Sequence, residues 1–206
     1  MTTRQYKQRR RAEAAGETRR RILDAVYEQL RAAPGDPISI DRVAQAADVA
    51  RSTVYVAFGS RLGLLDALGE DLLQRVGFER MLHLSRQPDA RESLRAGIQG
   101  LATMYAAERD VIRSLVSVVR LDTDALSGAI GRLEERRAWA MAHLANRLAD
   151  QDQLRPDLDP VDAADVLWLL TSFDAFDLLH TNRQLATERV ADTLTATAEH
   201  AICRDA

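Results

Sequence analysis

"SIDRVAQAADVARSTVYVAFGSRLGLL", residues 39–65, contains two short helical patterns separated by only a few residues. Ser39 can cap the first pattern, which carries Ile40 and Val43 at helical spacing. The second pattern begins near Val49 or Ala50 and is rich in β-branched and aromatic residues, which favour a strand by propensity. As a helix it can nevertheless turn one apolar side inward, made of Val49, Val54 and Phe58. Two helices of this length with so short a connection predict a helix-turn-helix.

The outward side of the second helix carries Arg51, Ser52, Thr53 and Tyr55. These side chains donate hydrogen bonds that suit base edges and phosphates, and few acidic residues lie nearby to repel DNA. We therefore expect tertiary packing, rather than propensity, to hold this helix, and we expect it to read a DNA groove.

Three residues give the pattern a specific likeness to the TetR family of transcriptional regulators. In that family a Tyr and a Phe three residues apart close the recognition helix and a basic residue opens the next helix; Tyr55, Phe58 and Arg61 occupy those places here. The sequence resembles the family over about 45 residues from Thr18 on. The resemblance implies an all-α fold of about nine helices, with an N-terminal three-helix helix-turn-helix DNA-binding domain followed by a helical effector-binding and dimerisation domain.

The resemblance also implies roles for single residues. Ser39, Tyr55 and Arg61 would hold phosphates and fix the register of the protein on the duplex. Base edges would be read by Arg51, Ser52 and Thr53, with Arg51 as the partner of a guanine.

The sequence departs from the family pattern at three positions. Asp48 stands at a turn position that is usually glycine, and Ala50 stands where a serine usually caps the recognition helix. A cap worth about 1 kcal/mol is therefore missing, or the Asp48 side chain replaces it. Arg61 replaces the usual lysine and can still hold a phosphate.

Charge is distributed unevenly along the 206 residues. Up to Ser60 there are 11 Lys and Arg against 7 Asp and Glu, a balance of +4, and the remainder has 17 against 24, a balance of −7. A basic head on an acidic body predicts an anionic partner at one end only. We expect residues 1–60 to form a basic tail and the DNA-binding domain, and residues 61–206 to form the effector-binding and dimerisation domain.

The N-terminal 16 residues are polar and rich in arginine without an apolar face, and we expect disorder at their start. The arginines at 9–11 would either enter a minor groove, or otherwise strengthen DNA binding, or remain a solvated tail. No apolar run reaches the roughly 18 residues of a membrane span, so we expect no membrane partner and a cytoplasmic protein. Cys203 is the only cysteine and is expected to be an inert thiol.

Helical periodicity continues through the second part of the chain. Ser60 can cap a long helix, Asp89 and Glu92 resemble a capping box, and Asp159 with Pro160 can open another helix. The expected helices cover residues 60–82, 89–105, 111–119, 123–149, 160–180 and a last one from 187. Residues 150–159 are expected to form a solvated turn.

The helix expected at 160–180 is apolar nearly all round and so must be covered on two sides. The last helix has a face of small residues that lets another backbone come close. These two helices from each subunit would form a four-helix bundle across a twofold homodimer, and the resemblance places the interface on the same helices. The candidate interface residues are Val166, Leu170, Asp177, Val190, Leu194, Ala198 and Ala201.

Arg137 falls in the middle of an apolar stripe of the helix expected at 123–149. An arginine there is paired with a carboxylate, extends to solvent, or anchors a ligand. Neighbouring aromatic and sulfur side chains could line an effector pocket, although each is also an ordinary core residue. The candidate effector-binding residues are Met104, Tyr105, Arg137, Trp168 and Phe173.

No catalytic constellation appears in the sequence. The four histidines lack metal-ligand spacing, and there is no phosphate loop, nucleophile elbow or paired carboxylate site. We therefore expect no enzyme, no cofactor and no metal. The expected function is a ligand-responsive DNA-binding regulator, a repressor that binds a palindromic operator as a dimer and is released by a small-molecule effector. The alternative is a helical ligand-binding or protein-interaction module without sequence-specific DNA binding.

Overall fold

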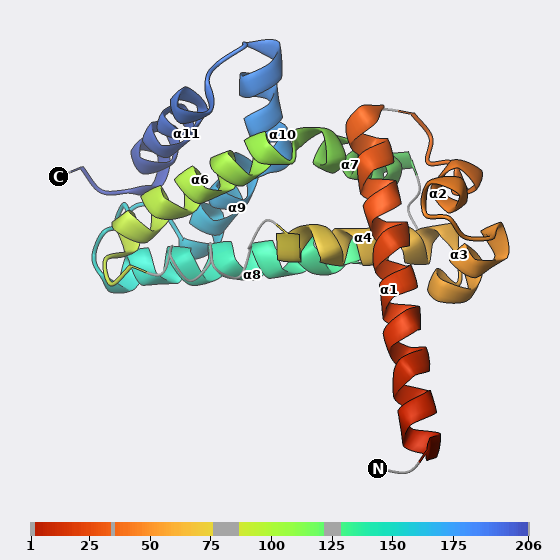
Figure 1. The fold of residues 1–206 in the computed structure, drawn as a ribbon. Helices are drawn as coiled ribbons and strands as arrows, with labels where there is room; N and C mark the ends of the chain where they lie inside the picture. The colour runs from red at the N-terminus through yellow and green to blue at the C-terminus, as the bar shows by residue number, and fades with distance from the viewer. Residues whose placement is uncertain (1–2, 34–35, 76–86, 122–128, 206) are drawn as a thin grey trace. The chain divides into compact units, whose positions relative to one another are not determined.

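The computed structural model describes residues 3–33, 36–75, 87–121 and 129–205, and these are helical apart from their connections (Figure 1). The all-α fold is thereby confirmed. The elements are α1 (Thr3–Ala32), α2 (Ile40–Ala46), α3 (Arg51–Phe58), α4 (Arg61–Arg75), α6 (Ala90–Ala107), α7 (Arg109–Leu121), α8 (Ala129–Asp150), α9 (Pro160–Leu170), α10 (Phe173–Asp177), η2 (Leu178–Asn182) and α11 (Thr187–Ile202). The expected parts of helices at 76–82 and 123–128 lie outside the described residues.

Contacts divide the chain into two compact units, residues 1–72 with 113–130 and residues 73–112 with 131–206. Most of α4 therefore belongs to the unit that contains the helix-turn-helix. The domain boundary expected at residue 60 stays a prediction.

The first unit is built around the second half of α1. Its buried apolar stripe faces α2 and α3 and consists of Ile22, Leu23, Val26, Tyr27 and Leu30. The helix begins already at Thr3, so the expected disorder at the start of the chain is wrong for the described residues. Arginine, alanine, glutamine and glutamate favour a helix without any apolar face, and Arg9 pairs with Glu13 one turn later at 2.9 Å.

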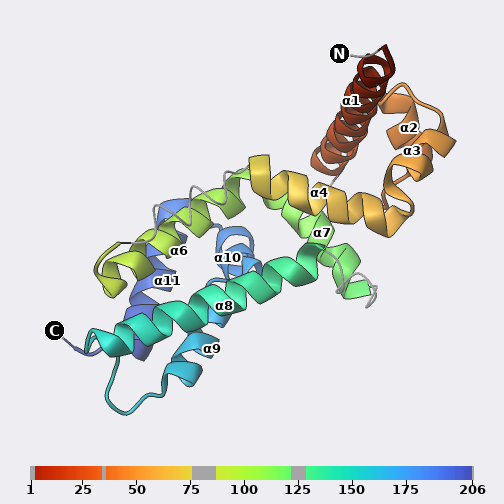
Figure 2. The same ribbon diagram turned by 90° about the horizontal axis from the view of Figure 1, so that it is seen from below.

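In the second unit, helix α6 packs along α11, which lies beside it (Figure 2). The expected cap is confirmed, because the Asp89 carboxylate accepts a hydrogen bond from the Glu92 backbone N–H at 2.8 Å. On α11, Val190, Leu194 and Ala198 are at most 6% exposed in the single chain. These three side chains fill the core of their own subunit, so their assignment to a dimer interface is wrong.

Residues 160–182 form three consecutive pieces instead of the one helix expected at 160–180. Asp159 caps α9 and Pro160 begins it, as expected. The helix stops at Leu170, because Ser172 takes an extended conformation and caps the next piece through a hydrogen bond from Ala175 N–H at 3.1 Å. The last turn is a π-helix, η2. Residues before and after the break at Thr171 and Ser172 therefore do not lie on one continuous helix, and the helix expected to be apolar nearly all round is not formed as such.

Candidate nucleic-acid interface

The helix-turn-helix is present as α2, the four residues 47–50, and α3. Ser39 caps α2, its hydroxyl accepting a hydrogen bond from Arg42 N–H at 3.3 Å. Asp48 has φ 52°, the left-handed conformation for which glycine is usual and which aspartate tolerates. Ala50 occupies the N-cap of α3 and offers no side-chain hydrogen bond. The turn thus keeps its geometry without the cap.

Helix α3 has a buried side and an exposed side. Val54 and Phe58 are buried, which confirms their inward direction, whereas Val49 is half-buried. Ser52, Tyr55 and Val56 are exposed and, at positions i, i+3 and i+4, share one side of the helix. Arg51 is exposed at the start of α3 and Thr53 is half-buried. Four of the six residues predicted to contact DNA therefore lie on one helix: Arg51, Ser52, Thr53 and Tyr55.

Val56 was missed in the sequence analysis, although it is 86% exposed in the middle of α3. A β-branched residue is normally interpreted as part of a packed face, and only its position four residues after Ser52 places it on the outer side. An apolar side chain on a groove-reading helix suits the methyl group of thymine.

Arg51 is held by a carboxylate of α2. Its Nη1 donates to both oxygens of Asp41, at 3.0 and 3.1 Å. The guanidinium also lies 5.9 Å from the centre of the Tyr55 ring. The pKa of Arg51 is raised above its ordinary value, first by a hydrogen bond with the Tyr55 side chain and then by the charge of Asp41. Asp41 thus restrains a side chain that the sequence assigns to base reading.

The C-terminal end of α3 is fixed from α1. Arg19 Nη1 donates to the carbonyl oxygen of Ala57 at 2.9 Å, and its guanidinium stacks 4.3 Å from the centre of the Phe58 ring. The carbonyl satisfied by Arg19 is one that a helix end leaves without an intrahelical partner. Arg19 therefore helps to set the position of α3, a role that the sequence pattern did not reveal.

The connection from α3 to α4 is equally tight. Gly59 has φ 74°, and the Ser60 hydroxyl accepts a hydrogen bond from Gly63 N–H at 3.0 Å, which confirms Ser60 as the cap. A Cβ atom on Gly63 would lie 2.2 Å from the carbonyl oxygen of Phe58. Only glycine lets α4 pass so close to the end of α3. Arg61 is exposed in the first turn of α4, where the phosphate role expected for it stays a prediction.

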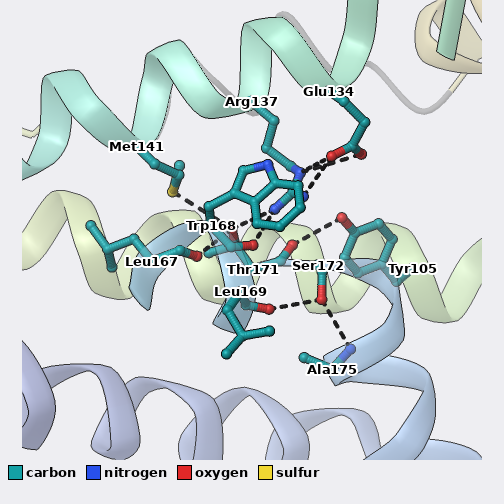
Figure 3. Close-up of polar contacts among 10 residues, drawn as sticks. All are labelled: Tyr105, Glu134, Arg137, Met141, Leu167, Trp168, Leu169, Thr171, Ser172 and Ala175. Carbon is teal, nitrogen blue, oxygen red and sulfur yellow. Dashed lines mark hydrogen bonds and ion pairs between the residues drawn. The ribbon is translucent and has the colours of Figure 1, made fainter. Parts of the chain in front are cut away.

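In the second unit, four of the five candidate effector residues meet around the break between α9 and α10. Figure 3 shows three of them, Tyr105, Arg137 and Trp168. The Tyr105 hydroxyl donates to the carbonyl oxygen of Thr171 at 3.0 Å, and its ring packs edge-on against Phe173 at 5.5 Å. Burial raises the pKa of Tyr105, so the hydroxyl stays neutral and donates. Met104, the fifth candidate, is half-buried on α6.

Arg137 joins α8 to this break. It is 8% exposed and donates to the Glu134 carboxylate, to the carbonyl oxygen of Trp168, and to the Thr171 hydroxyl at 3.2 Å. The Trp168 ring covers the guanidinium at 4.6 Å, as Figure 3 shows. Of the alternatives left open by the sequence, the pairing with a neighbouring carboxylate is present. Arg137 also satisfies carbonyl and hydroxyl groups at the end of α9.

The remaining interface candidates have mixed positions. Val166, Leu170 and Ala201 are half-buried in the single chain. Asp177 accepts hydrogen bonds from Arg109 at 3.1 Å and from Thr181 at 2.6 Å, so it is paired within the subunit. Larger apolar side chains are exposed in the single chain on α8, α9 and η2: Trp139, Val161, Trp168, Leu169 and Leu178.

Within residues 3–33, 36–75, 87–121 and 129–205, no group of three His, Cys, Asp or Glu side chains is placed to hold a metal ion. Over the same part of the chain no helix combines the length and apolar character of a membrane span. Cys203 is buried and free of disulfides, and burial raises the pKa of its thiol.

Many solved structures match this chain along most of its length. NalD, the secondary repressor of the MexAB-OprM multidrug efflux pump in Pseudomonas aeruginosa, is 22% identical, with 93% of this chain and 98% of that chain covered and a TM-score of 0.67. A regulatory protein of the TetR family from Rhodococcus RHA1 is 18% identical, with 91% and 98% covered and a TM-score of 0.71. This chain has the TetR-family fold.

A third similar structure is AibR in complex with isovaleryl coenzyme A and operator DNA. It is 17% identical to this chain, and the match covers 87% of this chain and 97% of AibR with a TM-score of 0.68. No protein-family model matches the sequence, and no curated protein matches it. At these identities the likeness to the TetR-family structures shows the fold, and the function has to be argued from the residues.

Proposed function

We propose that this chain is a ligand-responsive DNA-binding transcriptional regulator, a cytoplasmic repressor that binds a palindromic operator as a homodimer. The observation that carries the proposal is the outer side of α3. It presents Ser52, Tyr55 and Val56 together with Arg51, while Val54 and Phe58 secure the opposite side in the core. Such a surface combines donors for phosphates and base edges with one apolar contact for a thymine methyl.

Selection of bound fragments from genomic DNA tests this function directly. A regulator enriches a palindromic sequence, and its affinity falls steeply as salt rises, because phosphate contacts release counterions. If no sequence is enriched, or if the affinity for DNA does not change with salt concentration, a helical ligand-binding module is favoured instead. Genes beside the enriched sites would also suggest the effector.

Two substitutions separate base reading from phosphate binding. Arg51→Ala is expected to cost about 1–3 kcal/mol in binding and to relax the preference at one operator position, since Arg51 would contact a guanine. Tyr55→Phe removes a hydroxyl expected to hold a phosphate and should weaken all sequences alike. Binding curves on the selected operator and its single-base variants measure both. Unchanged affinity and base preference for Arg51→Ala would contradict its assignment.

The dimer requires a surface other than the buried side of α11. We propose that it uses the outer side of α9, where Val161 is 69% exposed and Leu169 is 61% exposed, with Val166 and Leu170 at its edge. Exposed apolar side chains of this size commonly mark a protein–protein contact. Leu169→Arg should give a monomer in analytical ultracentrifugation with an unchanged helical spectrum. A dimer of unchanged dissociation constant would place the interface elsewhere.

The effector would act at the break between α9 and α10. Tyr105 and Phe173 line its inner side, with Met104 next to Tyr105 on α6 and the Arg137–Trp168 pair on its outer side. A ligand that changes this packing would release DNA by preferring one conformation of the dimer over the other. Thermal unfolding of the chain with and without a candidate effector, repeated on Phe173→Leu, tests the location. An effector that stabilises both proteins equally binds elsewhere.

A further inference from the structure

The first half of α1 projects from its unit as a basic helical arm, defined here as residues 3–17. Figure 1 shows α1 continuing well past α2 and α3 toward the N-terminus. Residues 8–17 are exposed, and the first buried side chain after them is that of Ile22. At about 1.5 Å per residue the arm is roughly 22 Å long. Residues 8–17 thus present their side chains to solvent, with Arg9 paired to Glu13 inside the arm.

The composition of the arm indicates what it binds. It carries five basic residues (Arg4, Lys7, Arg9, Arg10 and Arg11) against two acidic ones (Glu13 and Glu17). Apart from Tyr6 its apolar residues are alanines, so it has no apolar stripe to lay on another protein or in a membrane surface. A basic helix without an apolar side suits a polyanion with regularly spaced charge, and duplex DNA carries one charge about every 1.7 Å.

The arm begins at the end of the helix assigned to base reading. Arg19, just after the arm, donates to the Ala57 carbonyl at the C-terminal end of α3. Residues 3–17 therefore extend beyond that end of α3 within the same unit. Duplex that continues past the base pairs read by α3 would run beside the arm.

We propose that the arm remains helical and binds the phosphates of DNA flanking the operator. This proposal rests on the DNA-binding function proposed above. A helix about 10–12 Å across does not fit a minor groove about 6 Å wide, so the arm lies along the backbone or in a major groove. The minor-groove insertion considered from the sequence would require the arm to unwind.

The test uses the full-length protein and two duplexes, one ending at the selected operator and one extended by 12 base pairs on each side, about one helical turn. Wild type should prefer the extended duplex. The variant R9Q/R10Q/R11Q should lose that preference, and its salt slope should fall by about 2.7 per chain if each arginine meets one phosphate. Between 50 and 200 mM salt that slope corresponds to roughly a 40-fold smaller loss of affinity per chain. An extended-duplex preference that survives in this variant would overturn the proposal.

Ala12→Pro tests the helical form with all charges retained. Ala12 is exposed and lies outside the buried core, so proline breaks the arm without disturbing the rest of the domain. Ala12→Leu is the matched control, because leucine keeps the helix. We expect Ala12→Pro to lose the preference and Ala12→Leu to retain it. If both retain it, an extended chain makes the contact and the helical arm is ruled out.

Failure of the arm is distinguishable from failure of the proposed function. If wild type enriches no operator at all, the DNA-binding function fails. If wild type binds its operator but gains nothing from the flanks, only the arm proposal fails. A wild-type arm that transfers the protein to anionic vesicles in competition with the extended duplex would show a membrane partner and would also overturn it.

Discussion

Helix α3 and the segment 160–182 both carry more apolar residues than one helical face buries, and they place the excess differently. In α3, Val54 and Phe58 enter the core while Val56 stands alone among polar side chains at 86% exposure. The segment 160–182 instead breaks, so that Phe173 and Phe176 return to the core. Other large apolar side chains of the same segment stay exposed: Val161, Trp168, Leu169 and Leu178. A single exposed apolar residue among donors suits base reading, whereas a group of them suits another protein chain.

The break itself is held by polar groups. Thr171 donates through its hydroxyl to the Leu167 carbonyl and Ser172 donates to the Leu169 carbonyl, both at 2.7 Å. Arg137 supplies a further donor to Trp168. The carbonyls of Leu167, Trp168 and Leu169 at the end of α9 thereby have donors, although the helix stops inside the folded unit. In α3 the corresponding end is served by Arg19 from α1.

Removing Arg137 should have the largest effect of the substitutions compared here. Arg137→Ala leaves the Trp168 carbonyl and the Thr171 hydroxyl without a donor and deletes the stacking partner of the Trp168 ring. We expect a loss of about 2–4 kcal/mol in the free energy of unfolding, measured by urea denaturation. The control is Glu135→Ala, an exposed neighbour on α8. Equal losses for the two variants would show that the break does not depend on Arg137.

The next largest effect is expected at Gly63, in the unit that contains the helix-turn-helix. An added Cβ would lie 2.2 Å from the Phe58 carbonyl oxygen, so Gly63→Ala forces α4 away from the end of α3. We expect a loss of about 1–3 kcal/mol in thermal unfolding. Gly16→Ala is the matched control, because nothing lies within 4 Å of its Cβ and alanine favours the helix. Its stability should stay level or rise, and a Gly63→Ala protein as stable as this control would contradict the close approach.

Substitutions at two helix caps should change stability by smaller amounts and in opposite directions. Ser172→Ala removes the hydroxyl that caps α10, and we expect a loss of about 1 kcal/mol. Ala50→Ser supplies α3 with the side-chain cap that it lacks, and we expect a gain of up to about 1 kcal/mol. Chemical denaturation of both variants measures the difference. A neutral Ala50→Ser would mean that the left-handed turn at Asp48 holds the serine away from the N-terminus of α3.

The sequence predicted the helix-turn-helix (the head) better than the second unit (the body), and the reason is physical. In the head, the short connection from α2 to α3 and the spacing of Val54 and Phe58 leave few alternatives to a helix-turn-helix. In the body, α11 has small and apolar residues on one side, and this pattern does not distinguish a core face from an interface. Val190 is 0% exposed on α11, which packs against α6 and α9 of the same chain. Periodicity identifies a buried side without naming its partner.

The same limit applies to single polar residues. Arg137 was singled out because it interrupts an apolar stripe, but its carbonyl partner Trp168 lies 31 residues away. Thr171 and Ser172 read as ordinary helix residues inside a long apolar segment, although a serine followed three residues later by Ala175 can cap a new helix. Contacts across the fold, which no local pattern contains, decided the break at Thr171.

The smallest predicted effect concerns the restraint on Arg51. Asp41 places a negative charge 3.0 Å from Arg51 Nη1 and also holds the guanidinium in one orientation. Exposed pairs of this kind contribute at most about 1 kcal/mol, so Asp41→Asn should raise affinity for unrelated DNA by roughly 2- to 5-fold. Because Arg51 then loses its orientation, the preference for guanine at its operator position should also weaken.

Asp36→Asn is the matched control, since Asp36 is an exposed acid of the same unit that pairs instead with Arg42 at 3.7 Å. It removes the same charge and leaves Arg51 in place. Both variants should bind unrelated DNA more tightly, and only Asp41→Asn should lose discrimination at one base pair. If the two variants read that base pair equally well, Asp41 acts on DNA through its charge alone. The exposed side of α3 would then set specificity without help from α2.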